Sequence, residues 1–103
     1  MERRRDERFD TDLPISLEQG GSGILRNVSA SGVYFLTDVD LKPGERIVFT
    51  VQFTALPIGT IVARCAALVR WVEPRGALRG VGAELEHVEF HRQEPLPAQP
   101  GGA

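Results

Sequence analysis

Cysteine and histidine are scarce in this sequence. Cys65 is the single cysteine among 103 residues, so neither a disulfide framework nor a cage of thiolates around a metal can form within one chain. It lies in an apolar, alternating run, which predicts a buried and reduced thiol. His87 and His91 are the two histidines. Because no carboxylate or cysteine pattern completes a ligand set around them, we expect surface histidines and no metal.

Long hydrophobic runs are also missing. No stretch approaches the roughly 18 apolar residues of a membrane span, although 42% of the residues are hydrophobic. The first residues are charged and do not resemble a secretory signal. We therefore expect one small cytoplasmic domain with a core of modest size and no membrane insertion.

The net charge argues against a broad basic surface. The 12 basic residues face 14 acidic ones, for a net charge of −2, whereas domains that bind nucleic-acid polymers are usually strongly basic. All the basic residues except Lys42 are arginines, and they crowd at the start of the chain. Arginine matches phosphate and guanine through paired hydrogen bonds and stacks on ring faces. This bias predicts a small anionic, aromatic ligand and no nucleic-acid polymer.

No arrangement typical of catalysis is visible. Ser29 and Ser31 have no histidine near them in the sequence, and the carboxylates are scattered over predicted exposed strand faces. A phosphate-binding loop of the Walker type is absent. We expect a binding protein that is not an enzyme and that carries no cofactor.

Short alternating apolar runs predict an all-β chain. Residues 41–45 are typical of a type II turn, with Pro43 at the first central position and Gly44 where a positive φ is needed. Six or seven short strands separated by turns indicate an antiparallel sandwich or, as the expected fold, a small six- to seven-stranded antiparallel barrel. The predicted strands are residues 13–17, 24–28, 33–36, 46–53, 60–72 and 81–85.

Alternation also predicts which side chains share a face. Leu25, Asn27 and Ser29 should point the same way. In residues 60–72, Trp71 should lie on the same face as Cys65, and small residues in the middle of this run suit either one strand in a crowded barrel or a bend between two strands. The β-branched residues at both ends of the run argue against a helix. A turn is predicted at residues 74–76.

Composition divides the chain into three parts. Residues 1–11 are too polar to pack and show no helical stripe, so they are expected to form a flexible N-terminal arm. Residues 12–92 form the barrel. Residues 93–103 hold three prolines and two glycines, which predicts a disordered tail.

The sequence contains two short motifs, one near its start and one about twenty residues later. Arg4-Arg5-Asp6-Glu7-Arg8 fits R-x-x-x-R, and Asn27-Val28-Ser29-Ala30-Ser31-Gly32 fits [D/N]-x-S-x-x-G. The second motif combines an amide, a hydroxyl and a glycine that lets the backbone turn or approach a ligand closely. Taken alone, the first is also an ordinary solvated charge run and the second an ordinary turn. Their combination ahead of a barrel pattern is more specific than either.

In that combination the chain resembles the PilZ domain, the bacterial receptor module for cyclic di-GMP. The resemblance covers about residues 3–90 and extends to Leu41-x-Pro43-Gly44, to Val69-Arg70 and to residues 81–85. It departs from the family in two places: Asn27 stands where many members carry aspartate, and the proline-rich end has no counterpart to the C-terminal helix of many relatives.

The resemblance implies a role for each motif residue. Arg4 and Arg8 would bind the guanine edges and phosphates of cyclic di-GMP, Asn27 and Ser29 would hold a guanine, and Gly32 would keep the turn open. Arg3 and Arg5 are further candidates. In the family, the residue just before the arm motif, here Arg3, influences whether one ligand or a stacked pair is bound.

The implied function is that of a single-domain cyclic di-GMP receptor that orders its arginine arm on binding and signals to a separate protein effector. Two alternatives stay open. One is an adaptor of the same fold that binds no nucleotide, as in type IV pilus systems. The other is a small oligonucleotide-binding barrel, for which a basic face and exposed stacking aromatics are lacking.

Overall fold

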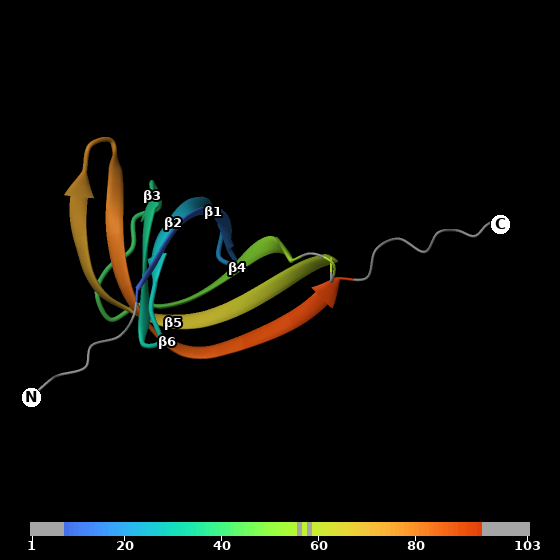
Figure 1. The fold of residues 1–103 in the computed structure, drawn as a ribbon. Coiled ribbons are helices and arrows are strands. Elements are labelled where there is room, and N and C mark those ends of the chain that lie inside the picture. The colour runs from blue at the N-terminus through green and yellow to red at the C-terminus, as the bar shows by residue number, and fades with distance from the viewer. Residues whose placement is uncertain (1–7, 56, 58, 94–103) are drawn as a thin grey trace, which may run out of the picture.

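Six antiparallel strands make up the fold of this protein. The structure is a computed structural model that describes residues 8–55, 57 and 59–93. The strands close into a barrel in the order β1-β2-β3-β6-β5-β4 (Figure 1), which confirms the predicted all-β barrel and excludes the sandwich. Their bounds are β1 Phe9–Leu17, β2 Ser22–Val28, β3 Gly32–Thr37, β4 Arg46–Ala55, β5 Gly59–Arg75 and β6 Leu78–Gln93.

The ends of the barrel differ from the predicted boundaries. β1 begins at Phe9, so residues 9–11 of the expected arm belong to this strand, and Phe9 and Asp10 pair with β2. β6 continues to Gln93, well past residue 85, where the last strand was predicted to end. Residues 1–7 and 94–103, which carry the rest of the expected arm and tail, lie outside the described residues. The described part of the chain contains no helix long and apolar enough to cross a membrane.

The core follows from the alternation of apolar residues. Phe35 and Phe49 are fully buried, and their ring centroids lie 5.9 Å apart. Cys65 is 6% exposed, as predicted, and burial raises the pKa of its thiol, which keeps it protonated and unreactive. The buried apolar residues are Ile15, Leu17, Leu25, Val33, Phe35, Leu41, Ile47, Phe49, Val51, Ala63, Cys65, Ala67, Val69, Val81 and Ala83.

The predicted turns are partly confirmed. Gly44 has φ 92°, and the Glu45 N–H donates to the Lys42 carbonyl at 3.1 Å, as a type II turn requires. The turn predicted at residues 74–76 begins too early. Pro74 pairs with Arg79 inside the hairpin, and the reversal falls on Gly76, with φ 64°, and the residue that follows it.

Two β-bulges correct the predicted faces. In β2, Leu25 pairs with Phe35 and Asn27 with Tyr34, so Arg26 is an extra residue. A bulge of this kind turns the side chains that follow it onto the other face. Leu25 therefore lies in the core while Asn27 lies on the outer surface, and the prediction that they share a face is wrong.

The second bulge is in β5, where Val69 pairs with Ala83 and Trp71 with Gly82, leaving Arg70 extra. Val69 is 1% exposed and Trp71 is 47% exposed. The prediction that Trp71 faces the core with Cys65 is therefore wrong for the same reason. β5 is nevertheless one continuous strand.

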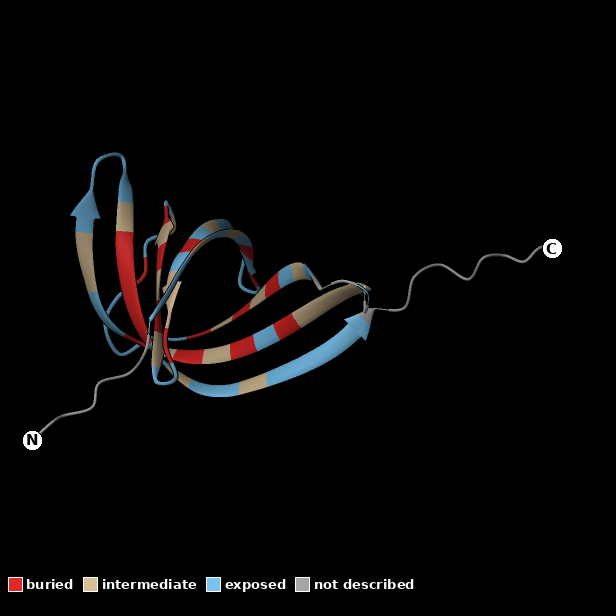
Figure 2. Ribbon diagram, in the orientation of Figure 1, coloured by how far each residue is buried: buried red, intermediate tan, exposed pale blue. Residues whose placement is uncertain are grey.

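Three strands continue beyond the barrel. β3 pairs with β6 only as far as Glu84, and β1 pairs with β4 only between Phe49 and Val51. Past these points, within the described ranges, β4, β5 and β6 pair only with one another. Figures 1 and 2 show them running outward together, with β6 largely exposed. We call this part, residues 52–55, 59–67 and 85–93, the sheet extension.

Candidate ligand-binding site

The sequence motifs meet at a cavity of about 370 Å³ on the outer surface of the barrel. This volume falls in the range of small-molecule sites, roughly 300–1,000 Å³. Four of the predicted site residues line it, namely Arg8, Asn27, Ser29 and Gly32. Arg3, Arg4 and Arg5 lie outside the described residues. The remaining lining residues are Ser31, Val33, Tyr34, Arg70, Trp71, Gly82, Ala83 and Glu84.

The turn between β2 and β3 is closed by its own polar groups. The Ser29 N–H donates to the Gly32 carbonyl at 2.8 Å, and the Gly32 N–H donates to Ser29 Oγ at 3.2 Å. The Ser29 side chain is 8% exposed, and its hydroxyl shares a 3.5 Å hydrogen bond with that of Ser31. The serine of the motif thus stabilises the turn from within.

Gly32 sits where a side chain does not fit. A Cβ added to this residue would lie 2.7 Å from the carbonyl oxygen of Ala83 on β6. Because the obstacle is backbone in a paired strand, it cannot rotate away. The glycine therefore allows β3 and β6 to pair directly beside the cavity.

Strand pairing brings the end of the arginine motif to the second motif. Phe9 pairs with Val28 and Asp10 with Asn27, which places Arg8 beside the turn. Arg8 Nη1 donates to Asn27 Oδ1 at 3.2 Å. The bulge at Arg26 is what turns the Asn27 amide outward to receive this bond.

An aromatic pair lies on the same outer surface. Tyr34 and Trp71 stack with ring centroids 5.5 Å apart and an interplanar angle of 26°. A Cβ on Gly82 would collide with the indole of Trp71, and a Cβ on Gly80 would collide with the phenol of Tyr34. These two glycines of β6 therefore make room for the pair. The half-exposed indole borders the cavity and offers a flat surface to a ring system.

Tyr34 is held in place by its hydroxyl. It donates to Glu73 Oε2 at 2.9 Å, and the Arg75 guanidinium lies 6.0 Å from the ring centroid. Desolvation raises the pKa of Tyr34, and the bond to Glu73 raises it further. The side chain is thus a neutral phenol that supports Trp71.

Arg70 brings a second cation to the cavity. Its Nη1 donates to Glu84 Oε1 at 3.2 Å, and both side chains are more than half exposed. Exposed ion pairs of this kind contribute about 0–1 kcal/mol, so Arg70 can exchange Glu84 for an anionic ligand at little cost. The site then presents the guanidinium groups of Arg8 and Arg70 on either side of the turn.

A second hollow of about 420 Å³ adjoins the cavity and shares Asn27 and Tyr34 with it. Arg26 in this hollow pairs with Asp12 at 3.1 Å. The residues that line it are Asp10, Thr11, Asp12, Arg26, Asn27, Tyr34, Leu36 and Arg75.

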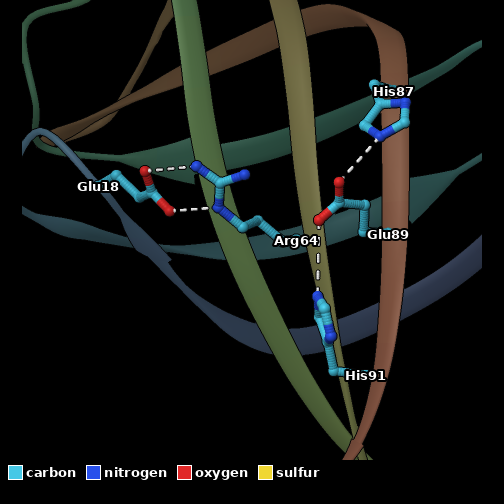
Figure 3. A network of polar contacts seen from close by, with 5 residues as sticks. All are labelled: Glu18, Arg64, His87, Glu89 and His91. Atoms are coloured by element: carbon cyan, nitrogen blue, oxygen red, sulfur yellow. Dashed lines mark hydrogen bonds and ion pairs between the residues drawn. The ribbon is translucent and has the colours of Figure 1, made fainter.

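The histidines lie elsewhere, on the outer face of the sheet extension. Figure 3 shows Glu89 between His87 and His91, at 3.2 and 3.5 Å, close to the Glu18–Arg64 pair. Both histidine side chains are more than 60% exposed, as predicted. Across the described ranges, no group of three or more His, Cys, Asp or Glu residues is placed to hold a metal ion.

Sequence reasoning missed Tyr34 and Trp71 as parts of the site. Their signals in the sequence are a lone tryptophan and two glycines, Gly80 and Gly82, in the facing strand. The match between these glycines and the two aromatic residues can be inferred only when the register of β5 against β6 is known, because the bulge at Arg70 shifts that register.

Comparison with known proteins gives the family. The fold resembles the structure of the Bacillus subtilis Inhibitor of motility (MotI/DgrA), with a TM-score of 0.69 and 20% sequence identity. The match covers 86% of this chain and 44% of that one, so this chain spans less than half of that protein, and the likeness concerns the fold alone. No curated protein sequence matches. Residues 2–96 match the model of the PilZ domain, and the chain therefore belongs to the PilZ domain family.

Proposed function

We propose that this protein is a receptor for cyclic di-GMP that binds the nucleotide in the cavity between the β2–β3 turn and Trp71. The observation that carries the proposal is the hydrogen bond between Arg8 and Asn27. It joins the two motifs at one cavity of suitable size, beside a turn that is already closed by Ser29 and Gly32.

The cavity offers each kind of contact that the ligand needs. The guanidinium groups of Arg8 and Arg70 match phosphate oxygens and the O6 and N7 acceptors of guanine. The Asn27 amide supplies a fixed polar partner at the base edge, and the indole of Trp71 provides a stacking surface worth about 1–3 kcal/mol per base. Glu84 is the anion that the phosphate would displace from Arg70.

Arg4 completes the proposed site from the N-terminal side. Contacts of Arg4 and Arg8 with the ligand would hold the arm against the cavity. Charge-assisted hydrogen bonds of about 1.5–3 kcal/mol each must exceed an ordering cost of about 1–2 kcal/mol per fixed residue. The arm is then the switch, and its bound arrangement is what a separate protein effector reads.

Calorimetric titration tests the proposal, with cyclic di-AMP and GTP as controls. Cyclic di-GMP should bind well ahead of cyclic di-AMP, because adenine presents an amino donor where guanine presents the O6 acceptor that arginine needs. Equal affinity for the two would contradict the assignment. Binding of neither would favour an adaptor that uses the fold alone, and salt-dependent binding of single strands would favour an oligonucleotide-binding barrel.

The same titration measures the stoichiometry. An arginine at position 3 suits stacking and phosphate contact with a second nucleotide, and the second hollow beside Asn27 supplies space for it. We expect saturation at two ligands per chain and a fall to one in Arg3→Ala. Saturation of the unchanged protein at one ligand would refute the pair.

A further inference from the structure

Among the residues that the structure describes, none pairs with the outer edge of β6 over most of the sheet extension. The last backbone bond on that side runs from the Leu85 N–H to the carbonyl of Ser31, in the turn before β3, at 3.0 Å. Glu86 is the extra residue of a bulge opposite Ala66 and Ala67, and from His87 to Gln93 β6 pairs with β5 on one side, while the register with β3 has ended on the other. Seven residues of strand, about 24 Å long, thus present a row of backbone donors and acceptors that no described strand pairs with.

The side chains of this edge alternate between two faces, and the inner one carries Val88, Phe90 and Arg92. Val88 packs partly against the core, and Phe90, opposite the buried Ala63, is 67% exposed. On the other face lie His87, Glu89 and His91 (Figure 3). An open strand edge with an exposed aromatic side chain is a template for pairing with another strand.

We propose that β6 pairs with β6 of a second copy of this chain, antiparallel and with the two-fold axis at Phe90. The two sheet extensions then form one continuous sheet. In this register Phe90 faces its own copy, and Glu89 of each chain faces His91 of the other. Aromatic pairs directly across an antiparallel ladder are stabilising, and an imidazole N–H of His91 can donate to the Glu89 carboxylate of the other chain.

Each neighbouring register opposes less favourable side chains or is blocked by the backbone bond to Ser31. Because a two-fold axis perpendicular to the sheet keeps the faces matched, it must pass beside one residue, and moving it by one residue shifts the pairing by two residues. An axis at Glu89 sets two carboxylates against each other, and an axis at His91 sets Phe90 against Arg92 and so loses the aromatic pair. An axis at Val88 drives the partner strand past Leu85, whose N–H is already bonded to Ser31.

The pairing leaves the nucleotide site open. The cavity uses β6 only at Gly82, Ala83 and Glu84, and the proposed interface begins beyond Glu86. The proposed dimer is therefore independent of the proposed receptor function, and it can be tested in the absence of nucleotide.

A cysteine scan of the inner face reads out the register. Val88→Cys, Phe90→Cys and Arg92→Cys are compared under oxidising conditions, and Cys65 does not interfere because it is 6% exposed. Phe90→Cys should crosslink two chains, since its β-carbons face each other across the axis. The other two should stay uncrosslinked, because each lies four residues along the ladder from its own copy. A crosslink at Val88 or Arg92 in place of Phe90 would overturn the proposal.

Charge exchange on the outer face tests the same register without new thiols. Sedimentation of the unchanged protein should show a monomer–dimer equilibrium. Glu89→His and His91→Glu each set like side chains against each other twice and should weaken dimerisation about tenfold, and the double exchange should restore it. His87→Glu, the same charge change outside the central pairs, is the control and should have little effect. A monomer at all concentrations, or a double exchange no better than the singles, would overturn the dimer.

Discussion

β5 and β6 run through both the barrel end, where the cavity lies, and the sheet extension, and their pairing differs between these two regions. At the barrel end, the bulge at Arg70 turns Trp71 outward, and the bulge at Arg26 on β2 does the same for Asn27. In the sheet extension from Thr60 to Ala66, the register runs without a shift and the strands simply alternate inward and outward. Irregular pairing creates a cavity with convergent side chains, whereas regular pairing leaves a flat face and an open edge.

The ion pairs of the two regions also differ, in the number of hydrogen bonds that hold each arginine. Arg70 reaches Glu84 through one hydrogen bond of 3.2 Å, while Arg64 holds Glu18 through two, at 2.6 and 3.1 Å. Bidentate pairs are the better-defined ones. The cavity end therefore keeps a cation that can change partners, and the extension end keeps its cation engaged.

The largest expected effect concerns the arginine arm. Among the three consecutive arginines, only Arg4 has another arginine, Arg8, four residues later. Arg4→Ala and Arg8→Ala should each weaken cyclic di-GMP binding about tenfold or more, because a lost contact with a charged group costs about 1.5–3 kcal/mol. Arg5→Ala, which removes the same charge, should be mild. Titrations of the three variants at two salt concentrations measure this.

A generic basic arm gives a different pattern. All three substitutions would then weaken binding alike, and the losses would shrink together as salt rises. Thermal melts of the free proteins serve as the control, and no variant should change the free energy of unfolding by more than about 0.5 kcal/mol. Equal losses of affinity in the three variants would mean that the arm attracts phosphate by its charge and does not recognise the guanine bases.

The next prediction compares how two exposed aromatic residues, one at the cavity and one on the sheet extension, affect the affinity for cyclic di-GMP. Trp71 is 47% exposed beside the cavity, and Phe90 is 67% exposed on the sheet extension. Trp71→Ala should cost about 1–3 kcal/mol of binding free energy through lost stacking. Phe90→Ala should leave the affinity unchanged. Equal affinities of the two variants for cyclic di-GMP would remove Trp71 from the site.

The third effect separates two glycines of the cavity. In Gly32→Ala the new methyl group meets the Ala83 carbonyl, which is backbone, while in Gly82→Ala it meets the Trp71 indole, which can rotate. Gly32→Ala should therefore lower the free energy of unfolding, by about 1–3 kcal/mol. Gly82→Ala should mainly weaken binding by displacing the indole. Denaturant unfolding and titration of both variants check this, and equal unfolding losses would contradict it.

The sequence was sufficient for the parts that depend on alternation and turn chemistry. The barrel, the inward set led by Ile47 and Phe49, and the turn at Gly44 follow from periods of two and from the need for a positive φ. Asn27 and Trp71 were assigned to the wrong faces because a bulge adds one residue without leaving a mark in the pattern. The site's aromatic support was missed for the same reason, since Gly82 faces Trp71 only in the shifted register.

The smallest expected effect compares the ion pairs at the two ends. Hydrogen bonding to Arg64, and in addition its charge, lowers the pKa of Glu18 below its ordinary value of 4.5. A carboxyl group with a lowered pKa in the folded state stabilises the protein above its ordinary pKa, and this contribution disappears as pH falls through the lowered value.

Glu18→Gln should therefore lower Tm slightly at pH 7 and leave it unchanged at a pH well below 4.5. The effect is small because the pair is solvent-exposed. Glu84→Gln is the matched control at the cavity end, where the single bond to Arg70 predicts a still smaller change at pH 7. Melting curves of both variants across the acid range measure the difference. An equal loss in the two, or a loss in Glu18→Gln that persists in acid, would show that the two-bond geometry of the Arg64 pair does not distinguish the sheet extension from the cavity.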